Sequence, residues 1–256
     1  MLVDLGHFPT RAKAQAAILA GDVEVDGLQC DKAGHAVPRD ARISIRTRRR
    51  WVGRGAEKLI AALDRFDVSC AGRVCMDIGA GSGGFTQVML ERGASQVYAV
   101  DVGYGQFDVK LRNDPRVVLL ERKNARTLST KEIPVPAKFF SMDVSFISIF
   151  KILPAIRPLM AEDAAGIILF KPNFEARKTE VKKGGLVLDP EIHRRLLTAA
   201  LQNFSDAGLA LVDLIPSPIR GGDGNIEYLL SITRRQSAAL PPDRIPSIVD
   251  QAFSSP

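Results

Sequence analysis

The segment that most limits the possible folds is the glycine-rich stretch at residues 76–86, "MDIGAGSGGFT". The apolar run "GRVCMDIG" leads into the glycines, and "TQVMLERG" continues with a helical pattern. A strand, a glycine turn and a helix in this order are typical of nucleotide-binding α/β domains. Glycine is used in such turns because its backbone bends tightly and allows a ligand to approach closely. We therefore predict an α/β fold that binds a ligand at this loop.

Strand patterns recur after the loop, in "QVYAVD", "RVVLLER", "KFFSMDVS" and "GIILFKP". Helices fit between them, notably at 147–160 and 190–207. Further on, "LALVDLIPSPI" and "IEYLLSITR" are two closely spaced strand candidates joined by "RGGDGN". Alternating strands and helices followed by a late hairpin predict a mostly parallel, seven-stranded sheet with one antiparallel strand near its edge. The Pro- and Ser-rich residues after Arg235 predict a frayed tail.

The first 46 residues have a different pattern. Thr10 is a candidate helix N-cap and Gly21 a C-terminal stop for a short helix. "VEVDG" then alternates and ends in an Asp-Gly turn, and "ARISI" alternates again. These patterns predict a small module in which a helix precedes a hairpin.

A strongly basic run follows this module. Between positions 39 and 58 there are eight Lys or Arg residues against two acidic ones: Arg39, Arg42, Arg46, Arg48, Arg49, Arg50, Arg54 and Lys58, with Asp40 and Glu57. The run is either a solvated linker or a stripe that contacts nucleic-acid phosphates. The net charge of +6 is compatible with a polyanionic partner but does not require one.

Composition excludes several other classes. The three cysteines form no CxxC pair, so neither a disulfide framework nor a metal site is expected, and a reducing cytoplasm fits best. The apolar run "IFKILPAIRPLM" is broken by charges and prolines, so no spanning helix is expected. The N-terminus has no signal-peptide pattern.

Three kinds of ligand could use the glycine loop: a dinucleotide, a nucleoside triphosphate or S-adenosylmethionine. Gly79, Gly81 and Gly84 match G-x-G-x-x-G, and Asp101 ends the next strand, where an acid would hold a ribose. The loop is not a Walker A motif. Asp77 would repel a pyrophosphate but could serve the ammonium group of methionine. We therefore expect S-adenosylmethionine.

Seven motifs distributed along the chain carry a family resemblance: "WVGRGAEKL", "DIGAGSGGFT", "AVDVGYGQ", "LRNDPRV", "DVSFIS", "FKPNFE" and "GNIEYLL". With these motifs the chain resembles the hemolysin A (TlyA) family over about residues 2–235. That family joins an S4 RNA-binding domain to a domain similar to FtsJ-type rRNA 2'-O-ribose methyltransferases. The resemblance implies a Rossmann-like class I methyltransferase fold and methylation of ribosomal RNA. The expected organisation is an S4-like α+β domain at 1–46, a basic linker at 47–57, the methyltransferase domain at 58–236 and a tail at 237–256.

The S4-like part departs from the family pattern in two places. Asp26 stands where the family usually has Asn, and the usual Arg-Leu-Asp opening is missing before Leu2. The first helix of that domain is therefore expected to be incomplete, through either a late start codon or a weakened copy of the module.

FtsJ-type enzymes use a Lys-Asp-Lys-Glu tetrad, which the matching motifs assign to Lys58, Asp143, Lys171 and Glu227. Each could instead be an ordinary charge: Lys58 part of the basic run, Lys171 a solvated strand end and Glu227 a lone sheet residue. As a tetrad, one lysine would take the proton of the ribose hydroxyl, helped by repulsion from the other, while the acids hold both in place.

The remaining expected site residues fall into two groups. The cofactor is expected to meet Asp77, Gly79, Ala80, Gly81, Gly83, Gly84, Phe85, Asp101, Val102, Asn124 and Asp143. Within this group, Asn124 stands where related enzymes tend to have an acid facing the adenine. RNA is expected to meet Arg11, Lys13, Lys32, Arg48, Arg49, Arg50, Arg54, Arg177, Lys178, Lys182 and Lys183. The segment that carries the last four could equally be a flexible charged loop.

Three functions remain open at this point. The first is an rRNA 2'-O-methyltransferase that acts in the cytoplasm on ribosomal RNA or ribosomal subunits. The second is a membrane-acting haemolysin, which would need a spanning or strongly amphipathic segment. The third is a non-catalytic RNA-binding protein that keeps the fold.

Overall fold

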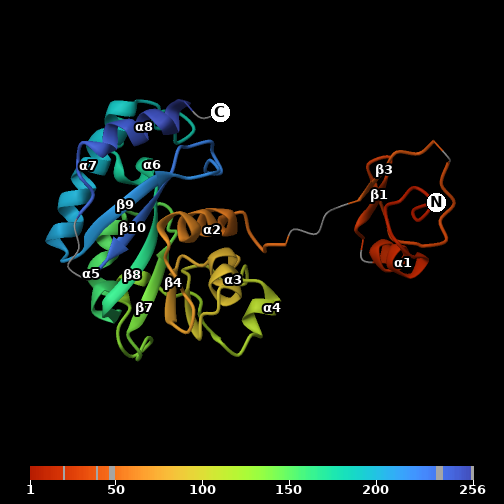
Figure 1. Cartoon of the computed structure of the whole chain (residues 1–256), viewed down its shortest axis with the longest axis horizontal. Helices are drawn as coiled ribbons and strands as arrows, with labels where there is room; N and C mark the ends of the chain where they lie inside the picture. The colour runs from red at the N-terminus through yellow and green to blue at the C-terminus, as the bar shows by residue number, and fades with distance from the viewer. Residues whose placement is uncertain (20, 39, 46–49, 235–238, 255–256) are drawn as a thin grey trace. The chain divides into compact units, whose positions relative to one another are not determined.

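The protein forms two compact units in the computed structural model, Met1–Arg50 and Trp51–Pro256 (Figure 1). The structure describes residues 1–19, 21–38, 40–45, 50–234 and 239–254. Each unit has its own sheet. We describe the units separately.

The smaller unit contains the predicted helix and hairpin. Helix α1 spans Arg11–Leu19, and Thr10 Oγ1 accepts a hydrogen bond from the backbone N–H of Lys13 at 3.2 Å, as expected of an N-cap. The antiparallel sheet has the order β2-β1-β3, with strands Leu28–Cys30, Val23–Val25 and Ile43–Ile45. Strand β2 was not predicted. The β1–β2 turn is formed by Asp26 and Gly27, whose φ angles of 51° and 80° match an Asp-Gly hairpin turn.

The larger unit is built on a seven-stranded sheet of order β6-β5-β4-β7-β8-β10-β9. Its strands are β4 (Val74–Ile78), β5 (Gln96–Val100), β6 (Val117–Leu120), β7 (Ala137–Met142), β8 (Met160–Phe170), β9 (Ala210–Pro216) and β10 (Tyr228–Thr233). Strands β4 to β8 are parallel, whereas β10 lies antiparallel between β8 and β9. The predicted mostly parallel sheet with an antiparallel strand near one edge is therefore confirmed.

Helices cover both faces of this sheet (Figure 1). They are α2 (Gly55–Phe66), α3 (Gly84–Glu91), α4 (Val109–Arg112), α5 (Leu153–Ile156), α6 (Pro172–Glu175), α7 (Pro190–Asp206) and α8 (Arg244–Ser254). One hydrophobic core joins α2 and α3 to the sheet, and a second joins α5, α7 and α8 to it. The helix predicted at 147–160 is only the short α5 between two 3-10 turns, at Ile149–Lys151 and Arg157–Leu159. Pro158 prevents α5 from continuing.

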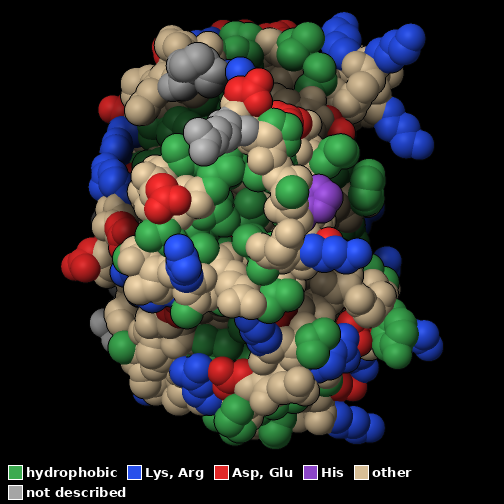
Figure 2. Space-filling model, turned by 90° about the vertical axis from the view of Figure 1, so that its right-hand side faces the viewer, with side chains coloured by type: hydrophobic (Ala, Val, Ile, Leu, Met, Phe, Trp, Pro, Cys, Tyr) green, Lys and Arg blue, Asp and Glu red, His purple; other side chains and the backbone are tan. Residues whose placement is uncertain are grey.

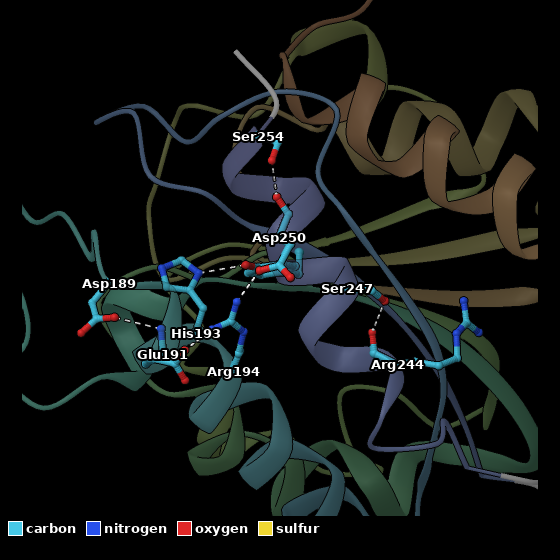
Figure 3. A network of polar contacts seen from close by, with 9 residues as sticks. Asp189, Glu191, His193, Arg194, Arg244, Ser247, Asp250 and Ser254 are labelled. Carbon is cyan, nitrogen blue, oxygen red and sulfur yellow. Dashed lines mark hydrogen bonds and ion pairs between the residues drawn. The ribbon is translucent and has the colours of Figure 1, made fainter.

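The expected frayed tail at 237–256 is wrong for most of its length. Residues Arg244–Ser254 form α8, whose buried side chains Ile245, Ile248, Val249 and Ala252 lie on one helical face. Arg194 of α7 forms an ion pair with Asp250 of α8, so the two helices are also joined by polar contacts (Figure 3). The helical spacing of these four apolar residues was not recognised in the sequence, because proline and serine residues surround them.

The predicted basic linker at 47–57 also needs correction. The boundary between the two units lies at Arg50–Trp51, and α2 begins at Gly55. Trp51 and Val52 pack against the core of the larger unit, and Val52 N–H donates to Gln87 of α3 at 3.0 Å. Residues 51–57 therefore belong to the larger unit. The apolar side chains of Trp51 and Val52 attach this basic stretch to the core.

Candidate active site

The carboxyl ends of the central parallel strands meet at one edge of the sheet, where polar loops begin. Asp143, directly after β7, donates its backbone N–H to Ile78 at the end of β4 at 2.9 Å. Gly79 donates its backbone N–H to Val100 at the end of β5 at 2.8 Å. In open α/β sheets ligands bind at such an edge. The predicted glycine loop, Asp101, Asp143 and Lys171 all lie there.

The glycine loop has the backbone that its sequence requires. Gly79, Gly81 and Gly83 have φ angles of 86°, 55° and 95°, in the left-handed region that favours glycine. A Cβ on Gly79 would lie 2.2 Å from the backbone oxygen of Asp143. Glycine at position 79 therefore allows the glycine loop to contact the loop that begins at Asp143.

Asp101 connects the glycine loop to the loop after β5. One carboxylate oxygen accepts from the backbone N–H of Gly81 at 2.7 Å. The other accepts from Gly103 N–H at 2.6 Å and from the Gln106 amide at 3.2 Å. The residue is only half-buried. Its carboxylate thus stands at the surface beside the glycine loop, where a ribose contact is geometrically possible.

Asp77 has different surroundings from those expected. It has no exposed surface, and its carboxylate accepts from Thr86 Oγ1 at 2.6 Å and from Ser141 Oγ at 2.8 Å. Burial raises its pKa to about 6, although both hydroxyls oppose this rise. This placement does not favour a direct contact with the methionine ammonium. Asp77 instead joins β4, α3 and β7 beneath the loop.

We expect Asp77→Asn to change how stability depends on pH. An acid whose folded-state pKa is raised binds more protons in the folded state, so its contribution to stability is lost as the pH rises from its unfolded to its folded pKa. With a pKa of about 6 against an ordinary 3.8, that loss is roughly 3 kcal/mol. The variant lacks this titration. Relative to the wild type it should therefore gain about that much unfolding free energy as the pH rises.

Denaturant unfolding of both proteins at several pH values between about 4 and 8 measures this difference. Asp223→Asn, at an exposed position, is the matched control. Parallel pH profiles for wild type and Asp77→Asn would contradict the prediction.

The four residues of the expected tetrad come together as two ion pairs. Lys58 Nζ of α2 lies 2.5 Å from Glu227 Oε2, just before β10. Lys171 Nζ, after β8, lies 2.6 Å from Asp143 Oδ1, after β7. The first pair is nearly buried, and the second is more open, with Lys171 and Asp143 side chains 12% and 24% exposed. The arrangement thus has a buried, supporting pair and a pair accessible to a substrate.

The accessible pair is only partly satisfied. Lys171 Nζ also donates to Ser145 Oγ at 3.1 Å and lies 5.8 Å from the centre of the Phe174 ring. Asp143 Oδ1, although close to Lys171 Nζ, is buried without a hydrogen bond of acceptable geometry. Buried polar atoms normally have such a bond. The Lys171 ammonium is therefore the partner of this oxygen, through its charge and not through a well-oriented hydrogen bond.

Neighbouring residues that sequence reasoning missed hold this pair in place. Glu175 of α6 accepts from Ser148 Oγ at 2.7 Å and from Ile149 N–H at 2.8 Å, which joins the segment after Lys171 to the loop after Asp143. Burial raises the pKa of Glu175. The motifs "DVSFIS" and "FKPNFE" contained these residues, but nothing in the sequence showed that the two motifs touch.

Phe146, in the same loop, is the second missed feature. Its side chain is 92% exposed, and its backbone φ of 64° is unusual for a bulky residue. The ring lies 5.1 Å from that of Phe174, centre to centre. An exposed aromatic residue with a strained backbone beside Lys171 points to a functional contact.

The other predicted cofactor residues divide by exposure. Ala80, Gly83, Gly84 and Phe85 are buried, and Gly84 lies so close to α2 that a Cβ there would be 3.2 Å from Ala56 N. These four shape the loop from within. Val102 is 75% exposed after β5. Asn124 is exposed after β6, and its side-chain oxygen accepts from Arg126 N–H at 3.0 Å.

The predicted RNA-binding residues lie on both units. Arg11, Lys13 and Lys32 are exposed on the smaller unit, whereas Arg48 and Arg49 lie outside the described residues. Arg50 and Arg54 are exposed near the boundary. Lys and Arg side chains project at many points of the face shown in Figure 2. Among the described helices, none has the length and apolar character needed to span a membrane.

The basic segment after Lys171 has defined contacts. Its members Arg177, Lys178, Lys182 and Lys183 are all exposed. Glu180, between them, accepts from Arg177 N–H at 2.9 Å and pairs with Arg195 of α7. Asn225 donates to Gly185 O at 2.8 Å and accepts from Val187 N–H at 3.2 Å. The segment is therefore connected to the residues that precede Glu227.

A buried histidine joins α7 to strand β10 of the sheet (Figure 3). His193 is hydrogen-bonded through Nδ1 to the Tyr228 hydroxyl and through Nε2 to Val187 O, each at 2.9 Å. Asp189 caps α7 by accepting from Glu191 N–H at 2.9 Å. The network supports the position of Glu227, next to Tyr228.

Comparison with known proteins finds methyltransferases that match nearly the whole chain. The FtsJ-like methyltransferase family matches residues 51–234. The 16S/23S rRNA (cytidine-2'-O)-methyltransferase TlyA of Mycobacterium tuberculosis is 42% identical over 255 residues, covering 99% of this chain and 95% of that protein. Hemolysin A of Brachyspira hyodysenteriae is 40% identical over 226 residues, which cover 88% of this chain and 94% of that protein. A solved structure of a candidate hemolysin from Streptococcus thermophilus is 37% identical with a TM-score of 0.78, covering 96% and 90%.

The mostly parallel sheet, the glycine loop and the family match define the class: a Rossmann-like methyltransferase. The chain belongs to the FtsJ-like methyltransferase family and, within it, to the hemolysin A (TlyA) relatives.

Proposed function

We propose that this protein transfers a methyl group from S-adenosylmethionine to a ribose 2'-hydroxyl of ribosomal RNA. The observation that supports this most is the pairing of Lys58 with Glu227 and of Lys171 with Asp143 at the sheet edge that carries the glycine loop. One pair is nearly buried, and the other is more exposed. The M. tuberculosis relative bears the name of the same reaction.

The residues around the loop fit S-adenosylmethionine. The half-buried carboxylate of Asp101 suits two ribose hydroxyls, and the Asn124 amide suits the edge of an adenine. The Asp143 carboxylate, whose side chain is 24% exposed beside the glycine loop, would suit the ammonium of the methionine part. When bound, the cofactor supplies an activated methyl group on a sulfonium. The Asp101 carboxylate would add a charge-assisted contact, so Asp101→Ala should weaken cofactor binding.

The chain's own residues orient the nucleophile. A ribose hydroxyl is weakly nucleophilic, and its attack requires in-line placement at about 3 to 3.5 Å from the reacting carbon. Lys171 Nζ is held by Asp143 and Ser145, so it can orient the hydroxyl. To act as the general base, the ammonium must first release its own proton to solvent, after which the neutral amine accepts the proton of the hydroxyl. Lys58 and Glu227 hold each other in place as the nearly buried ion pair of the site.

The same surroundings suit single-stranded or flipped-out RNA. The exposed Phe146 ring beside Lys171 offers a stacking face for a nucleobase. The exposed basic residues of the smaller unit and of the 177–183 segment would contact phosphates of the RNA. Ribosomal RNA or a ribosomal subunit is therefore the proposed partner. The proposed location of the reaction is the cytoplasm, where ribosomes are found.

Mapping of 2'-O-methylated positions in ribosomal RNA, from cells with and without this gene, tests the proposal. We expect at least one position to lose its methyl group in the absence of the gene. The purified protein with S-adenosylmethionine should restore it on ribosomal subunits from those cells. Identical maps, together with no transfer in vitro, would contradict the proposed reaction.

A further inference from the structure

A large cavity lies next to Glu227, outside the residues assigned so far to cofactor or nucleophile. Its volume is about 850 Å³. The wall is formed by α2, the end of β9, the loop that follows β9, and α8. Four arginines from different elements line it: Arg54, Arg65, Arg220 and Arg244. Part of the cavity wall is α8, in the segment for which the sequence predicted a frayed tail.

The sheet register places the cavity in line with the active site. Tyr228, at the start of β10, pairs with Phe170 at the end of β8 and with Pro216 at the end of β9. The carboxyl ends of β8 and β9 therefore lie at the same edge. Going along this edge from β4, a strand of RNA would pass the glycine loop, then Lys171, then the start of β10 and finally the cavity.

The charges in the cavity favour an anion. Glu227 is the acidic residue among those that line the cavity, and the neighbouring Asp213 pairs with two of the arginines. Glu227 is already paired with Lys58 at 2.5 Å. Asp213 is shared, since it lies 3.9 Å from Arg65 and 3.4 Å from Arg244. Arg54 has no ion-pair partner among the residues that the structure describes, and its guanidinium lies near Gly222. The charge of Arg54 is therefore not balanced by an acid in the part of the chain that the structure describes.

Shape and polarity narrow the class of anion. The remaining wall is mainly apolar, with Leu214, Ile215, Pro218 and Ile248 among its members. A volume of this size holds a small organic ligand, not only an inorganic ion. Arginine guanidinium groups bind phosphates with paired hydrogen bonds, and an apolar wall accepts a sugar or a base. A nucleotide combines both features.

We propose that this cavity binds one nucleotide of the substrate RNA, flanking the nucleotide that is methylated, with its phosphodiester against the arginines. The inference depends on the proposed function, because the RNA must run from Lys171 past Glu227 to reach the cavity. It assigns Arg220 and Arg244 to substrate binding, which neither the sequence motifs nor the tetrad did.

The test uses the full-length protein, S-adenosylmethionine and ribosomal subunits from cells that lack the gene. Arg220→Gln and Arg244→Gln should each raise the KM for subunits about tenfold, with a much smaller change in kcat and unchanged cofactor affinity. For a single-stranded RNA probe, each variant should reduce the slope of log binding constant against log salt by about 0.7. Arg92→Gln is the matched control, because Arg92 is also exposed and paired with an acid, Asp64 at 2.7 Å.

The outcomes separate the two proposals. If the wild type transfers no methyl group to the subunits, the proposed function fails and the cavity assignment with it. If the wild type is active but both variants keep its KM and salt slope, the cavity assignment alone is overturned. It is also overturned if cytidine monophosphate or inorganic phosphate binds in a way that depends on Arg220 and Arg244 while the KM for subunits stays unchanged, because the cavity would then be a separate anion site.

Discussion

Lys171→Ala is expected to slow methyl transfer by about 10² to 10⁴, the range typical of a lost acid-base group, with cofactor binding nearly intact. Lys171 Nζ lies 2.6 Å from Asp143 Oδ1 and 3.1 Å from Ser145 Oγ, so the loop after β7 fixes the position of the amine. Alanine removes the amine but leaves the glycine loop and Asp101 in place. The effect should therefore appear in the chemical step.

Lys171→Arg separates positioning from proton transfer. A guanidinium can also pair with Asp143, but it stays protonated and cannot act as a base. If proton transfer is the role of Lys171, the arginine variant should be nearly as slow as the alanine variant. If the residue only orients the ribose through its charge, arginine should recover much of the rate.

Single-turnover methyl transfer to ribosomal subunits, measured across pH for wild type and both variants, provides the test. Cofactor binding by calorimetry confirms that the site is intact, and Lys138→Ala, at an exposed lysine on β7, serves as control. A near-wild-type rate for Lys171→Ala at saturating cofactor and RNA would remove Lys171 from the mechanism.

The sheet could be predicted because each of its strands is an apolar run with a clear end. The strand patterns from "GRVCMDIG" to "IEYLLSITR" correspond to β4–β10, and the glycine loop joins β4 to α3 as expected. Local patterns sufficed because the central strands β4, β5 and β7 are mostly buried on both faces and are therefore mainly apolar. Helix α8 escaped prediction because only four buried side chains, amid proline and serine, mark its apolar face.

The site was harder to predict, for a different physical reason. The motifs identified Lys58, Asp143, Lys171 and Glu227, but the partner of each charge depends on strand order, which no local pattern contains. The chain brings Glu227 to Lys58 only because β10 inserts beside β8. Asp77 shows the converse: its position before the glycines suggested a ligand contact, yet Thr86 and Ser141 enclose it.

The Lys58–Glu227 pair leads to the second large prediction, which concerns stability. The side chains are only 10% and 6% exposed, so removal of one partner leaves a buried charge without compensation. Such a loss typically costs about 3 to 5 kcal/mol. We therefore expect Glu227→Ala to lower the unfolding free energy by that amount and to abolish methyl transfer.

A double variant distinguishes the structural role of the pair from its catalytic role. Replacement of a buried ion pair by apolar side chains of similar size is often neutral or stabilising. Lys58→Met combined with Glu227→Leu should therefore recover most of the stability lost in Glu227→Ala, while activity stays absent, because the charges that surround the nucleophile are missing. Denaturant unfolding and single-turnover transfer are measured on the same preparations. If the double variant regains activity with stability, the pair only supports the fold. If Glu227→Ala unfolds like the wild type, the pair is not the buried, charged contact described above.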